Sequence, residues 1–184
     1  MRGLRIAIGV WIFLLIAVGV VLCSRDARAD TNTDTDTDTE KLSAYVDWIH
    51  RDMQPKYAQS AKRLIPPLIK YAKKYNVDPL LIGCIFYWES SWRNFEGDKG
   101  EIGPGHTIPS KRLSEFNLGT LEGQIEASVY MWRLSIIKCK TLEKALTRYL
   151  SGKCVSKSEK TKKKVQYRKR YYLRINKKFK KTKQ

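Results

Sequence analysis

Glu89 closes an apolar run and is followed by two serines, and fourteen residues later the turn-forming run Gly103-Pro104-Gly105-His106-Thr107-Ile108-Pro109 begins. A single carboxyl group carried by an apolar helix into a glycine-lined turn is what acid/base cleavage of a glycan requires. Aromatic residues lie on both sides, at 86–88 and at Trp92, and a low-dielectric setting disfavours the charged form of a carboxyl group. We therefore expect Glu89 to hold a proton and donate it to a glycosidic oxygen. The alternative is a helix-end glutamate capped by its own serines.

The segment before Glu89 has the features of a buried central helix. Asp78 is a suitable N-cap and Pro79 fits the first helical position. Residues 80–88 are apolar on nearly all sides, which is typical of a helix inside a core. Residues 94–105 contain four glycines and one proline, so we expect a loop or a short hairpin-like turn there.

Apolar residues at three- and four-residue steps predict further helices on both sides of this segment. The predicted helices are 42–53, with Thr39 as a possible cap, 68–75 after two prolines, 121–137 and 142–150. The sequence shows no alternating strand pattern of any length. The predicted fold class is therefore mainly α, with a small β-ribbon in the 94–109 loop as an alternative.

The amino-terminal residues indicate export. Arg2 and Arg5 precede an uncharged run from Ile6 to Cys23, and residues 27–29 read Ala-Arg-Ala, a small-x-small cleavage site. We interpret residues 1–29 as a signal peptide, with a membrane anchor formed by residues 6–23 as the alternative. Either way, we expect the rest of the chain in the periplasm or the cell envelope. If residues 6–23 are not removed, they would anchor it in the inner membrane.

Composition divides the remaining chain into three parts. Residues 30–39 alternate threonine with aspartate, and we interpret them as a flexible, low-complexity leader. Residues 40–156 are long enough for one compact domain. Residues 157–184 form a basic C-terminal helix or tail, because residues 157–183 contain eleven lysines and three arginines against one glutamate.

The basic tail indicates an anionic partner. Val165, Tyr172, Ile175 and Phe179 recur at helical spacing, which predicts a helix with one apolar side and a dense cationic face. Such a face attracts anionic envelope polymers or a membrane surface. We expect no nucleic acid partner for an exported protein. The alternative is a final helix that packs on the domain and whose cationic face is only solvated.

The cysteines predict one disulfide. Cys139 and Cys154 bracket a short helical segment in an oxidising compartment, and closing a loop of that size stabilises a fold by roughly 3 kcal/mol. Cys84 lies in an apolar run and is expected to be a small buried residue. His50 and His106 have no ligand spacing to the cysteines, so we predict neither a metal nor a cofactor.

Four short motifs follow one another within residues 68–152: Asp78-Pro79, Glu89-Ser90, the run from Gly100 to Pro109, and Tyr149-Leu150-Ser151-Gly152. Their order and spacing resemble the catalytic domain of lytic transglycosylases, of the soluble-lytic-transglycosylase type related to goose-type lysozymes. In that family an Asp-Pro helix start leads to a catalytic Glu-Ser, then to a Gly-x-x-Gly-Leu-Met-Gln-x-x-Pro loop, and later to a Tyr-Asn-Ala-Gly turn. The resemblance implies a single lysozyme-like domain.

The resemblance also implies a substrate and a mechanism. The substrate would be peptidoglycan, cleaved at the β-1,4 bond between N-acetylmuramic acid and N-acetylglucosamine. Glu89 would act as the single acid/base, first protonating the leaving oxygen and then taking the proton from the muramoyl 6-hydroxyl, which leaves a 1,6-anhydromuramoyl end. The substrate N-acetyl group would stand in for the missing nucleophile.

The resemblance assigns further site residues by position. Gly103 matches a loop glycine, Ser90 matches a serine that hydrogen-bonds near the catalytic carboxyl, and Tyr149 matches a tyrosine that approaches it. The family's Leu-Met-Gln is replaced by Pro104-Gly105-His106, so we expect His106 to line the site. The asparagine of the last turn is replaced by Leu150.

The sequence is also compatible with other functions. The loop acids Glu96, Asp98 and Glu101 could hold a water molecule, which would give a goose-type-like muramidase that hydrolyses the same bond. A degenerate domain would give a non-catalytic peptidoglycan-binding protein. In a third class, the tail makes the protein a membrane-active cationic effector. Local opening of the cell wall could serve its remodelling or the assembly of an envelope-spanning machine.

Overall fold

The computed structural model describes residues 31–51, 55–94 and 96–180 of the chain. The predicted signal peptide or anchor, Asp30, Met53 and the last four residues lie outside the described ranges. The described residues from Thr37 onward form one compact unit, and residues 31–36 belong to a separate one. The described residues are mainly helical, which confirms the predicted fold class. In these ranges no helix has both the length and the apolar character needed to cross a bilayer.

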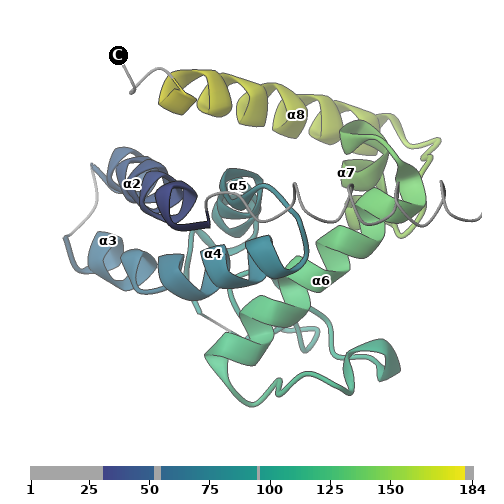
Figure 1. The fold of residues 1–184 in the computed structure, drawn as a ribbon. Coiled ribbons are helices and arrows are strands. Elements are labelled where there is room, and N and C mark those ends of the chain that lie inside the picture. Colours follow the sequence, from purple (N-terminus) through teal and green to yellow (C-terminus); the bar gives the residue numbers. More distant parts are fainter. Residues whose placement is uncertain (1–30, 52–54, 95, 181–184) are drawn as a thin grey trace, which may run out of the picture. The chain divides into compact units, whose positions relative to one another are not determined.

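Helix α5 (Pro79–Ser90) is the central element, as predicted (Figure 1). Its N-cap is Asp78, whose Oδ1 accepts a hydrogen bond of 2.9 Å from the backbone N–H of Leu80. Its residues from Leu80 to Phe86 are all buried. Gly83 has a packing role, because a Cβ there would lie 2.8 Å from the Leu42 side chain and 2.9 Å from the Trp92 ring.

The other helices pack around α5 and contribute to one hydrophobic core. They are α2 (Thr31–His50), α3 (Pro55–Lys62), α4 (Ile65–Lys74), α6 (Leu121–Cys139), α7 (Leu142–Ser151) and α8 (Glu159–Lys180). Thr120 and Thr141 cap α6 and α7, each accepting a backbone hydrogen bond at its side-chain oxygen. The prolines at 66 and 67 lie in the first turn of α4, where a missing N–H costs nothing.

At the amino-terminal side, residues 31–39 form the first turns of α2, and Thr39 lies inside that helix instead of capping it, so the predicted start of this helix was wrong. Threonine and aspartate are weak helix formers, but aspartates near a helix N-terminus are favoured by the helix dipole. Helix α3 was not predicted at all.

The segment between α5 and α6 is a loop, as predicted, with one 3₁₀ turn, η1 (Lys111–Leu113). The β-ribbon is reduced to isolated antiparallel bridges in which Ile102 pairs with Glu96 and with Thr107. Ile102 and Thr107 exchange both backbone hydrogen bonds, each 3.0 Å long. The residues between them are therefore held as a tight turn.

Helix α8 packs onto the domain, so the compact unit continues beyond residue 156, where the sequence predicted its end. The four predicted apolar residues, Val165, Tyr172, Ile175 and Phe179, are all buried. The Tyr172 hydroxyl donates a hydrogen bond to Asp78, the N-cap of α5. The opposite face of α8 carries exposed lysines and arginines. Both the packed helix and the cationic face predicted for this segment are therefore present.

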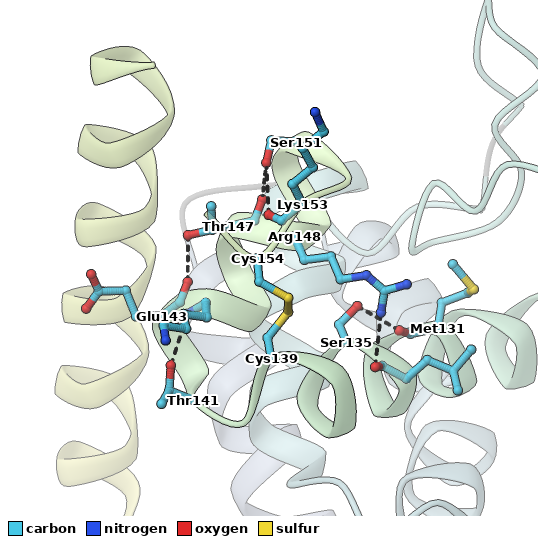
Figure 2. Close-up of a disulfide and its surroundings, with 12 residues drawn as sticks. Met131, Ser135, Cys139, Thr141, Glu143, Thr147, Arg148, Ser151, Lys153 and Cys154 are labelled. Carbon is cyan, nitrogen blue, oxygen red and sulfur yellow. Dashed lines mark hydrogen bonds between the residues drawn. A yellow bond between two sulfur atoms is a disulfide. The ribbon is translucent and has the colours of Figure 1, made fainter. Parts of the chain in front are cut away.

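The predicted disulfide between Cys139 and Cys154 is confirmed (Figure 2). It joins the end of α6 to the segment that follows α7. Arg148 strengthens the same junction, because its Nη1 donates a 3.0 Å hydrogen bond to the carbonyl oxygen of Leu134 on α6. Cys84 is buried, and burial raises the pKa of its thiol to about 12.

Removing the disulfide is expected to lower the free energy of unfolding by about 3 kcal/mol, because the bond closes a loop of 15 residues. The change is a double replacement of Cys139 and Cys154 by serine, measured by urea denaturation. Reduced wild-type protein should unfold at the same urea concentration as the variant. Equal stability of the variant and oxidised wild type would contradict the expectation.

Candidate active site

Glu89 lies in the last turn of α5 and is paired with Arg168 of α8. Arg168 Nη1 donates a hydrogen bond of 2.6 Å to Glu89 Oε1. The pair is largely removed from water, since the side chains of Arg168 and Glu89 are 4% and 18% exposed. A charge-assisted contact of this length between buried groups is among the stronger polar interactions in proteins. It fixes the Glu89 carboxyl group against the C-terminal helix.

One aromatic ring lies against this ion pair, and a second ring packs on the first. The Arg168 guanidinium lies over the Trp88 ring, 5.1 Å from its centroid, in a cation–π contact. Tyr171 of α8 meets the same Trp88 ring edge to face, at 5.7 Å between centroids. The sequence placed Glu89 among aromatic residues, and the structure adds a permanent cation, Arg168, beside the carboxyl group.

The end of α5 is held in an unusual backbone conformation. Ser91 and Trp92 both have positive φ, 54° and 63°, which costs about 1–3 kcal/mol at a non-glycine residue. Burial of the Trp92 side chain, which is 2% exposed, offsets this cost. The backbone N–H groups of Ser91 and Trp92 donate to the carbonyls of Tyr87 and Phe86 and close the helix. The position of Glu89 is thereby set by the core.

The glycine-rich turn is tied to three helices. Ser90 Oγ at the end of α5 donates to the carbonyl oxygen of Pro104 at 2.8 Å. The Tyr149 hydroxyl of α7 donates to the carbonyl oxygen of Gly105 at 2.7 Å. Thr107 Oγ1 and Ser128 Oγ of α6 share a hydrogen bond of 2.6 Å. The structure thus brings Glu89-Ser90, the 103–107 turn and Tyr149 together.

Close packing explains two of the glycines. Gly103 has a φ of 71°, and a Cβ there would lie 2.8 Å from the Gln124 side chain. At Gly105 a Cβ would lie 2.5 Å from Ser128 Oγ. His106, between the tied residues 105 and 107, has a φ of 47° and is partly exposed. The turn is therefore pressed against α6, with His106 at its edge.

The pKa of the Tyr149 phenol reflects the burial and the charges around it. Burial raises the pKa of its phenol, the Glu89 carboxyl group raises it further, and the Arg168 guanidinium partly offsets both effects. All three groups thus lie within electrostatic reach of one another. The Tyr149 ring also stacks on Trp132, 5.1 Å between centroids. A cavity of about 250 Å³ lies beside Tyr149, with Thr107, Ser128 and Met131 in its wall.

The loop acids lie at the surface of the turn region. Glu96 and Asp98 are exposed. Glu101 Oε2 accepts a hydrogen bond from the backbone N–H of Lys99 at 3.0 Å, which turns this carboxylate toward its own loop. These contacts resemble those of solvated loop acids more than those of a second catalytic carboxylate held opposite Glu89.

Arg168 is the site residue that sequence reasoning missed, although a signal was present. It lies three residues after Val165 and four before Tyr172, within the apolar side of the helix that the sequence predicted. A cation at a core-facing position must find a buried partner, because an unpaired buried charge is very costly. Glu89, itself at the end of an apolar helix, was the suitable partner.

Comparisons with models of protein families, with curated proteins and with solved structures found no match.

Replacing Tyr149 by phenylalanine is expected to lower the free energy of unfolding by about 1 kcal/mol, because the Gly105 carbonyl loses its donor while the ring keeps its stacking on Trp132. Urea denaturation measures the change. Tyr167→Phe is the matched control, since Tyr167 is 60% exposed, and its effect should stay within about 0.5 kcal/mol. Equal effects of the two changes would show that the hydrogen bond from Tyr149 to the Gly105 carbonyl does not stabilise the fold.

Proposed function

We propose that this protein is an exported peptidoglycan lytic transglycosylase with Glu89 as its single general acid/base. The observation that carries the proposal is the convergence of Glu89-Ser90, the 103–107 turn and Tyr149, three motifs far apart in the chain, at one tied cluster. Enzymes hold catalytic groups in place with side chains whose own positions are fixed by packing and hydrogen bonds. That is how this cluster is built.

The proposed reaction has two proton transfers at one carboxyl group. Glu89 gives its proton to the glycosidic oxygen as the bond to the muramoyl carbon breaks. The substrate N-acetyl oxygen stabilises the cationic carbon. Glu89, now a carboxylate, then takes the proton of the muramoyl 6-hydroxyl as that oxygen bonds to the same carbon. The bond count balances without water, and the enzyme returns to its starting state.

Arg168 would act through Glu89 in this scheme. When Glu89 loses its proton, negative charge develops on the carboxyl group, and a guanidinium already in place stabilises that charge without reorganisation. The contact has the opposite effect on the start of the cycle, because Glu89 must carry a proton before it can donate one. A substrate that displaces or loosens the Arg168 contact on binding would resolve this conflict.

Mass spectrometry of the fragments released from purified peptidoglycan tests the proposal. Fragments with 1,6-anhydromuramoyl ends are the expected products. Fragments with hydrated reducing ends would instead identify a muramidase. If no fragment is released at any pH or salt concentration at which the protein stays folded, the proposal is wrong.

The buried ion pair favours a second candidate, a non-catalytic peptidoglycan-binding protein. In that case Glu89 and Arg168 serve only to fasten α8 to α5, a purely structural role that such pairs often have. Binding to intact peptidoglycan without release of fragments, unchanged by Glu89→Gln, would identify this candidate.

The outer face of α8 supports the proposal of an anionic partner, either a wall polymer or a membrane surface. Its exposed cations lie along one face of the helix while the opposite face is buried in the core. Attraction of this kind weakens as salt screens the charges. Helix α8 thus has two separate roles in the proposal, one for each face.

Replacing three exposed lysines of α8 by glutamine is expected to weaken binding to an anionic polymer several-fold at low salt, with the difference vanishing at high salt. The three are Lys160, Lys163 and Lys164. The matched control replaces three exposed lysines outside α8, namely Lys111, Lys138 and Lys153. Co-sedimentation with the polymer across a salt series measures the effect, and equal loss in both triple variants would contradict a role for α8.

A further inference from the structure

A second cavity lies beside the turn that ends α5. Its volume is about 610 Å³, within the range of about 300–1,000 Å³ typical of small-molecule sites. Residues from α2, α3, the link between α3 and α4, the segment after α5 and the first residue of α6 form its wall. Leu64, Trp92 and Leu121 supply apolar surface, while Ser60, Ser91 and Asn94 supply hydrogen-bonding groups.

The charge in this cavity is positive. Arg63 and Arg93 come from different parts of the chain and both line it, and none of the described lining residues is acidic. Residues 30–156 contain eighteen basic and sixteen acidic side chains, so most of the positive charge of the domain lies in α8 and not in this part. Two guanidinium groups that share one cavity without a carboxylate are therefore a local feature. Guanidinium groups bind carboxylates in a planar, two-pronged geometry.

The cavity is connected to the candidate active site through Arg93. Its Nε donates a hydrogen bond of 2.9 Å to the carbonyl oxygen of Ser90, and its backbone N–H donates to Ser90 Oγ at 3.1 Å. Ser90 follows Glu89 directly and also holds the glycine-rich turn. A ligand bound by Arg93 is thus four residues along the chain from Glu89, the group that would cleave the glycan.

We infer that this cavity binds the carboxylate-bearing stem peptide of peptidoglycan, through Arg63 and Arg93. The inference rests on the proposed function for the identity of the peptide. The apolar wall suits a ligand with aliphatic bulk beside its charges, which favours a peptide over a bare phosphate polymer. The cavity would favour binding to peptidoglycan that still carries its stem peptides.

The test is a binding measurement by isothermal titration calorimetry with the full chain in a non-ionic detergent. Four probes are compared: an N-acetylmuramoyl peptide with free carboxylates, the same peptide with its carboxylates amidated, chitotetraose, which has no peptide, and a glycerol phosphate oligomer. All titrations use the Glu89→Gln variant, so that turnover cannot disturb them. The free carboxylates are expected to strengthen binding about tenfold or more over the amidated peptide.

Arg63→Gln should remove that preference, and Arg112→Gln, at an exposed arginine outside the cavity wall, should keep it. Equal binding of the two peptides, or a preference that survives Arg63→Gln, would overturn the inference. So would absence of peptide binding, or tighter binding of a glycerol phosphate oligomer. Failure of the proposed function is distinct, because it would show as missing anhydro products while carboxylate-dependent binding persists.

Discussion

Replacing Glu89 by glutamine is expected to reduce the release of anhydromuramoyl fragments by about 10²- to 10⁴-fold, the usual contribution of a general acid or base. Glutamine is nearly the same size and can still accept a hydrogen bond from Arg168, but it cannot donate or take the proton that the reaction needs. The measurement is the initial rate of fragment release from purified peptidoglycan, followed by mass spectrometry of the products.

Glu143→Gln is the matched control for this change. Glu143 Oε2 accepts a hydrogen bond of 2.8 Å from Lys169 Nζ, so it too pairs with a cation of α8, one residue along from Arg168. Its side chain is 44% exposed, and activity should stay within about twofold. A Glu89→Gln variant with the activity of the control would show that Glu89 is not the acid/base. Loss of activity in Glu101→Gln as well would favour a second carboxylate.

Replacing Arg168 by methionine is expected to lower the free energy of unfolding by about 3–5 kcal/mol, because it leaves Glu89 without its cation in a largely buried setting. Methionine keeps much of the side-chain length, so lost volume contributes little. Equilibrium urea denaturation measures the effect. The adjacent Lys169→Met is the control, since the Lys169–Glu143 pair is partly exposed and should contribute less than about 1 kcal/mol.

Combining the two changes tests whether the ion pair causes this loss. The Arg168→Met, Glu89→Gln double variant should recover part of the stability, since it removes the unpaired charge as well as its partner. If the two single losses simply add, the pair makes no net contribution, and Arg168 matters for its packing against Trp88 alone.

Helices with strong local signals could be predicted from the sequence. Asp78-Pro79 marked the start of α5 because an N-cap side chain and a proline at the first position act within a few residues. Helix α3 lacked such a signal, since its eight residues include only Tyr57, Ala58 and Ala61 as apolar members. At residues 31–39 the low helix propensity of threonine and aspartate indicated a leader, and the helix nevertheless extends through them.

The candidate site was predictable where motifs are local and unpredictable where it depends on long-range contacts. The sequence placed Glu89, Ser90, Gly103, His106 and Tyr149 in one site, and the structure ties the turn to Ser90 and Tyr149. Which backbone groups these side chains hold could not be read from spacing. The cation beside Glu89 comes from a helix whose register on α5 depends on the packing of the whole domain.

The Glu89–Arg168 contact also has a consequence for how the protein is made. The two residues are 79 positions apart, and Arg168 lies within the last helix. While the chain is being synthesised, Glu89 emerges long before its partner. The contact is therefore among the last to form. A chain that stops early or is cut after α7 would keep Glu89 but lose Arg168. The Glu89–Arg168 pair can therefore form only when the chain has been synthesised through α8.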